Sequence, residues 1–175
     1  MKRKTKDLTD EDRRRIRGRL FIWMNSLGNA EGHLSTALHY IANPTPNKVH
    51  SKYAVAGCIN TAVMRFGAIT RKGDGHRLVE ANQKMTQKYW AKVQSASLAG
   101  EEISRLSGVL RKVNQYRDNL LAHSNAEHLM PIGYDIVEAM SVSGKLGLDV
   151  DEIAFWRDCT KKLMVGDVSP GWSLI

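Results

Sequence analysis

Apolar residues recur along most of the chain at spacings of three and four, the period of an amphipathic α-helix. The first such stretch follows Thr9, which we expect to cap a helix whose first turn carries acidic residues. Its apolar stripe consists of Ile16, Leu20, Trp23, Met24 and Leu27. Gly28 and Gly32 interrupt the pattern, which then resumes to about Ala42. The sequence therefore predicts either one kinked helix or two consecutive ones, ended by Pro44 and Pro46.

Further helices are predicted at about residues 51–69, 76–93, 101–124 and 134–142, with a last one after Asp149. The helix at 51–69 is apolar on more than one face, which indicates a central position. The helix at 76–93 is polar on most sides, and a stretch of Ser, Ala and Gly follows it up to Gly100. Asp149 and Glu152 have the spacing of a capping box. No strand-like alternation competes, so the predicted fold class is all-α, an up-and-down helical bundle of about four to six helices in one domain, residues 1–175.

The charge is positive and uneven. The formal net charge is +8, and basic residues gather in an N-terminal arm at about residues 1–9 and in the helix after it. Arg13, Arg14 and Arg17 are candidates for contact with RNA. The alternative is a solvated tail followed by the polar face of a helix.

Composition also limits the class of protein. Cys58 and Cys159 lack metal-ligand or disulfide spacing, so we expect two buried thiols. No apolar run reaches the roughly 18 residues that span a bilayer, and no signal segment follows the charged N-terminus. We therefore expect a cytoplasmic protein with no membrane partner. The histidines show no ligand spacing either, so no metal and no other cofactor is predicted.

Arg117 and His123 form the main constellation that indicates chemistry. An arginine four to six residues before a histidine is weak as a bare pattern, and Arg71 with His76 makes a second match across a glycine loop. Geometry separates the two pairs. With Tyr116 as zero, the core-facing arc of the helix at 101–124 covers roughly 40° to 140°, Arg117 falls at about 100°, and His123 falls at about −20°.

Two interpretations of this pair stay open at this point. An arginine within an apolar arc needs a partner or a wet cleft, because an unpaired buried charge is very costly. A purely structural interpretation has Arg117 paired with a carboxylate on a neighbouring helix. His123 would then cap the C-terminus of its own helix.

The string RDNLLAHSN, residues 117–125, resembles the signature of the HEPN superfamily (higher eukaryotes and prokaryotes nucleotide-binding), in particular its abortive-infection-like members. In that signature a polar residue follows the arginine and a small residue precedes the histidine, as Asp118 and Ala122 do here. One branch of the family carries a tyrosine two residues after the histidine. Asn125 stands there, so regulation by modification of that tyrosine is not supported.

The resemblance implies a homodimer in which two Arg and His pairs face each other across a cleft, and a metal-independent endoribonuclease. His123 would transfer protons, and Arg117 would hold the phosphate. Asn119 lies one turn before His123 and would orient it, whereas Asp118 points away on an ideal helix.

This interpretation implies three partners: RNA, a second copy of the chain, and an antitoxin or regulatory protein. The chain itself would act as a toxin or antiphage effector. Two alternatives remain. One is a non-catalytic helical module that binds RNA, a nucleotide or a partner protein. The other is a structural helical protein in which the pair serves only as a salt bridge and a cap.

Overall fold

The computed structural model describes residues 9–70, 90–117 and 147–165. Its elements are α1 (Asp10–Ala42), α2 (Lys48–Thr70), a helical segment at residues 90–97, α4 (Gly100–Tyr116) and α7 (Val150–Val165). No strand occurs in these three ranges. The predicted all-α bundle is therefore confirmed. Three parts of the prediction lie outside the described residues: residues 76–89 of the helix predicted at 76–93, residues 118–124 of the helix predicted at 101–124, and the whole helix predicted at 134–142.

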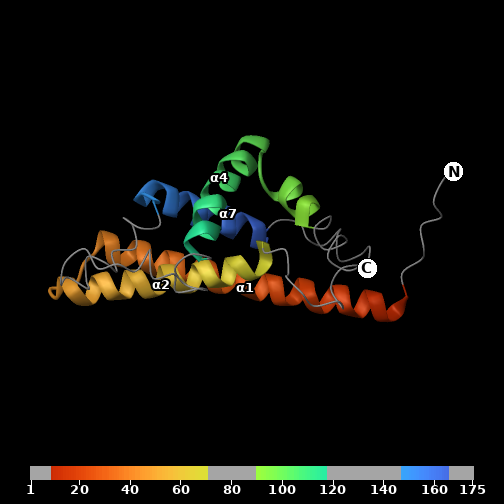
Figure 1. The fold of residues 1–175 in the computed structure, drawn as a ribbon, viewed down its shortest axis with the longest axis horizontal. Coiled ribbons are helices and arrows are strands. Elements are labelled where there is room, and N and C mark those ends of the chain that lie inside the picture. The colour runs from red at the N-terminus through yellow and green to blue at the C-terminus, as the bar shows by residue number, and fades with distance from the viewer. Residues whose placement is uncertain (1–8, 71–89, 118–146, 166–175) are drawn as a thin grey trace.

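Helices α1 and α2 form a long antiparallel hairpin that is the base of the molecule (Figure 1). Of the two possibilities left open for the first stretch, the structure has one continuous helix, which runs through Gly28 and Gly32. The turn into α2 is held by side chains. The Ser51 hydroxyl accepts a hydrogen bond from the Thr45 amide at 2.7 Å, and the Asn47 side chain caps the amide of Val49 at 3.1 Å.

Helices α4 and α7 lie together on one side of this hairpin (Figure 1). The predicted capping box at the start of α7 is confirmed: the Glu152 amide donates to Asp149 Oδ1 at 2.7 Å, and the Asp149 amide donates to Glu152 Oε2 at 3.2 Å. Lys112 of α4 bonds Glu152 Oε1 at 2.8 Å and the Gly147 carbonyl at 2.8 Å. These contacts fix the start of α7 against α4.

The core lies where α1, α2, α4 and α7 meet. Phe66 and Trp156 are fully buried and meet edge to face, with ring centroids 5.7 Å apart. Trp90 is half-buried and makes similar contacts with Trp23 at 5.7 Å and with Phe66 at 6.5 Å. Trp156 is thus a core residue, and Trp23 and Trp90 pack against the core.

Some predictions differ from the structure. The pattern predicted a helix end near Val93, but the segment at 90–97 is helical to Ser97. Val93 packs on the core, and the serine and alanine residues that follow it are compatible with a helix. Helix α2 is less central than predicted, since Tyr53 and Met64 are exposed. Cys159 is buried as predicted, whereas Cys58 is only half-buried.

The first part of α1 extends beyond the end of α2 (Figure 1). At 33 residues against 23, α1 is about 50 Å long and α2 about 35 Å. Phe21 and Ile22 of α1 are 67% and 61% exposed. Within the described ranges, none of the helices combines the length and apolar character needed to cross a membrane.

Candidate functional site

Arg117 lies directly after the last residue of α4, on the face that packs into the core. Its backbone is still helical, and its amide donates to the carbonyls of Val113 and Asn114. The buried stripe of α4 comprises Leu106, Val109, Leu110, Val113 and Tyr116. Arg117 continues this stripe and is only 6% exposed. The predicted position of Arg117 inside the apolar arc is therefore confirmed.

The guanidinium of Arg117 is seated on the backbone of α2. Its Nη1 donates a hydrogen bond to the Gly67 carbonyl at 3.1 Å. A Cβ atom added to Gly67 would lie 2.6 Å from Nη1 and 2.7 Å from Cδ of Arg117, closer than real Cβ contacts. Gly67 is thus the position at which α2 leaves room for the arginine. The acceptor on α2 is a peptide carbonyl, and the expected pairing of Arg117 with a carboxylate stays a prediction.

Tyr116 provides a second anchor beside Arg117. Its hydroxyl donates to Asn60 Oδ1 on α2 at 2.9 Å. Burial raises the pKa of this phenol above its ordinary value, so the group stays protonated at neutral pH and remains a donor. Asn60 and Gly67 are seven residues apart, close to two helical turns, and lie on one face of α2. The end of α4 is therefore fixed at two points.

The structure describes only some of the other predicted site residues. Asp118, Asn119 and His123 lie outside the described residues. Arg13 and Arg17 belong to α1, but their side chains are also outside the described part; Arg14 is exposed on the same helix. The structure thus locates Arg117 and Arg14 and leaves the joining of Arg117 to His123 a prediction.

Sequence reasoning missed the two α2 residues that seat this end of α4. Asn60 and Gly67 had no motif that singled them out. A signal was present for Gly67, because a glycine in an otherwise apolar helix costs about 1 kcal/mol relative to alanine and often reflects a close approach.

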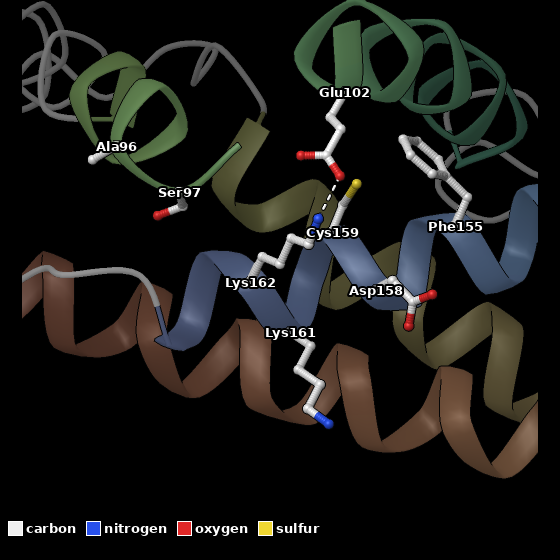
Figure 2. A pocket seen from close by; sticks show the side chains of 8 residues that line it. All are labelled: Ala96, Ser97, Glu102, Phe155, Asp158, Cys159, Lys161 and Lys162. Atoms are coloured by element: carbon white, nitrogen blue, oxygen red, sulfur yellow. Dashed lines mark hydrogen bonds and ion pairs between the residues drawn. The ribbon is translucent and has the colours of Figure 1, made fainter. Parts of the chain in front are cut away.

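A pocket of about 600 Å³ between α4, α7 and the segment at 90–97 was also not predicted. Figure 2 shows the eight side chains that line it, with Glu102 of α4 reaching across to Lys162 of α7 in an ion pair. Ala96 and Ser97 lie on one side, and Cys159 lies close to the ion pair. The remaining lining residues are Phe155, Asp158 and Lys161.

The chemistry of this pocket does not favour catalysis. Burial raises the pKa of the Cys159 thiol to about 11, so the thiolate that would act as nucleophile is scarce at neutral pH. The hydrogen bond from Lys162 lowers the pKa of Glu102, and the same bond raises the pKa of Lys162. Both groups are therefore charged at neutral pH and neutralise each other. The described residues contain no cluster of three or more side chains suited to hold a metal ion.

Comparison of the chain with models of known protein families, with curated proteins and with solved structures gives no match. Function is therefore inferred from the residues themselves, and Arg117 is the side chain with the most specific seat.

Proposed function

We propose that the chain is a metal-independent endoribonuclease of HEPN type that acts as a homodimer. The observation that carries the proposal is the seat of Arg117. This guanidinium is held on the Gly67 carbonyl, in a space that only glycine leaves open, at the point where α4 leads into the sequence RDNLLAHSN. A fixed, permanently charged fork of donors is the usual means of positioning a phosphate.

In the proposed reaction His123 removes the proton from a ribose 2′-hydroxyl. The resulting oxygen attacks the adjacent phosphorus, and the bond to the 5′-oxygen of the next nucleotide breaks. Protonation of that leaving oxygen by an imidazolium completes the step. The products are a 2′,3′-cyclic phosphate and a 5′-hydroxyl, so no water is consumed. An imidazole suits both proton transfers because it titrates near neutral pH.

Arg117 would stabilise the charge that gathers on the phosphate oxygens in the transition state. Removal of one such preorganised donor typically lowers the rate by roughly 10²–10³-fold. Asn119 would orient His123, and the basic part of α1 with Arg13, Arg14 and Arg17 would hold the RNA backbone.

The test is cleavage of a panel of structured and unstructured RNAs by the purified full-length protein in the presence of a chelator. Arg117→Ala and His123→Ala should each abolish cleavage. Arg111→Ala is the matched control, because Arg111 is an exposed arginine of the same helix and its loss removes equal charge. If all four proteins leave the RNA intact, or if His123→Ala cleaves as fast as the wild type, the proposal is wrong.

A second candidate is a non-catalytic helical module that binds RNA through its basic surface. The burial of Arg117 favours this candidate, since an arginine that is 6% exposed and bonded to a backbone carbonyl also serves as a structural anchor. In that case Arg117→Ala lowers the free energy of unfolding without changing RNA integrity, and Arg14→Ala weakens RNA binding. Arg117→Lys separates the two roles, because lysine keeps the charge but lacks the fork.

The proposal includes a cytoplasmic toxin or antiphage effector that an antitoxin or regulatory protein restrains. Induced expression of the wild-type chain should then arrest growth of the host cell, and His123→Ala should relieve the arrest at an equal protein level. Equal growth with both proteins would contradict the toxin role while leaving the cleavage assay to decide the activity.

A further inference from the structure

A groove distinct from the Arg117 seat runs between the end of α1, the first three turns of α2 and the start of α7. Its volume is about 370 Å³. The main apolar side chains that line it are Ile41, Pro44, Val55, Ile59, Val150 and Ile153. Ile59 and Ile153 are buried and form the floor, whereas Val150 is 48% exposed at the mouth. The groove is thus an apolar hollow that opens to solvent.

Two lysines at the start of α2 line this groove. Lys48 and Lys52 lie one turn apart on α2, line the hollow and are exposed. Within the described ranges neither takes part in an ion pair. Two of the acidic residues at the start of α7 are already engaged, since Asp149 caps the helix and Glu152 binds Lys112. Among the described residues, the lining of the groove therefore contains two lysines and no carboxylate.

Along α2 the lining of the groove changes from charged to apolar. The lysines belong to the first two turns of α2, and Val55 and Ile59 follow along the same side without a further charged residue in the lining. This order matches a ligand with one anionic head and one apolar tail. An acidic helix of a partner protein would instead bring charges along its whole length. The volume falls at the lower end of the range of small-molecule pockets, about 300–1,000 Å³.

We propose that this groove binds a small anionic amphiphile, an unbranched alkyl carboxylate, with its tail on Ile59 and Ile153 and its carboxylate between Lys48 and Lys52. Burial of the tail supplies most of the affinity. The two lysines select an anionic head over a neutral or cationic one. This site shares no residue with the proposed ribonuclease centre, so either proposal stands or fails without the other.

The test is isothermal titration of the full-length protein with decanoate, at concentrations below micelle formation, beside decanol and decyltrimethylammonium. Decanoate should bind with a stoichiometry of one. The double variant Lys48→Glu/Lys52→Glu should weaken binding by about tenfold or more, since two charge contacts are replaced by two repulsions. Lys161→Glu is the matched control, because Lys161 is an exposed lysine that lines the other pocket, and it should bind as the wild type does.

Val150→Asp provides a second variant that keeps the fold. It places a carboxylate at the mouth of the groove, in the first turn of α7, where an acidic residue is favoured by the helix dipole. This variant should also bind decanoate more weakly while its circular dichroism spectrum is unchanged. The proposal is overturned if decanoate does not bind, if decyltrimethylammonium binds equally well, or if the double lysine variant retains full affinity. If an acidic amphipathic peptide binds the groove and decanoate does not, the proposal is also overturned, and the groove is assigned to a protein partner.

Discussion

Substitution of Gly67 by alanine tests the seat of Arg117 without removing the arginine itself. Alanine in the interior of a helix is favoured over glycine by about 1 kcal/mol. At this position the added Cβ would approach Nη1 to 2.6 Å and Cδ to 2.7 Å, whereas unstrained carbon contacts are about 3.5–4.0 Å. Overpacking of this kind costs about 1–3 kcal/mol. The Arg117 side chain must therefore move off the Gly67 carbonyl.

The expected net effect of Gly67→Ala is a loss of about 1–2 kcal/mol in the free energy of unfolding, because the steric cost and the weakened hydrogen bond exceed the gain in helix propensity. In an Arg117→Ala background the clash is absent. There the same substitution should stabilise the protein by about 0.5–1 kcal/mol. The double-mutant cycle should thus report a coupling of about 2 kcal/mol between the two positions.

Urea denaturation followed by circular dichroism measures all four corners of this cycle. Gly57→Ala is the matched control, since Gly57 lies in the same helix and a Cβ added there meets nothing within 4 Å. That variant should gain about 0.5–1 kcal/mol in either background. If Gly67→Ala stabilises the wild-type protein as Gly57→Ala does, the close packing of Arg117 on α2 is wrong.

Three further outcomes follow from local contacts. Asp149→Ala should lower the free energy of unfolding by about 1 kcal/mol in urea denaturation because α7 loses its cap, and Asp151→Ala in the same turn should have a smaller effect. The hydrogen bond from Lys162 lowers the pKa of Glu102, so this carboxylate contributes stability above its ordinary pKa of 4.5 and loses that contribution as the pH falls through the lowered value. Glu102→Gln should therefore flatten the acid limb of a curve of stability against pH. An unchanged acid limb would argue against the ion pair. Cys159, with a pKa of about 11, should react with iodoacetamide at pH 8 at least about tenfold more slowly than the half-buried Cys58. Peptide mass spectrometry measures the two rates.

The predictable part of the fold rests on periodicity and capping. The spacing of apolar residues placed α1, α2 and α7 within a few residues of their observed ends, and it placed the start of α4 within one residue. The spacing of Asp149 and Glu152 predicted the two hydrogen bonds observed between them, because a capping box is a local interaction within one helical turn. The 100° rotation per residue also placed Arg117 on the buried side of α4.

The unpredicted features depend on contacts between helices that are far apart in the sequence. Gly67 lies 50 residues from Arg117, and nothing local to either position shows that they meet. The continuity of α1 through Gly28 and Gly32 could not be decided from propensity, since tertiary packing outweighs a cost of about 1 kcal/mol per glycine. The exposure of Tyr53 and Met64 likewise depends on which faces of α2 the other helices leave uncovered.

Cleavage of a matched pair of oligonucleotides tests the central claim most directly. One is an all-RNA strand, and the other has the same sequence with a 2′-O-methyl group on every ribose. With a chelator present, the wild-type protein should cleave only the unmodified strand and leave 2′,3′-cyclic phosphate and 5′-hydroxyl ends, because the attacking oxygen is the ribose 2′-hydroxyl. Cleavage of the methylated strand, products with 5′-phosphate ends, or no cleavage of either strand would contradict the proposed function.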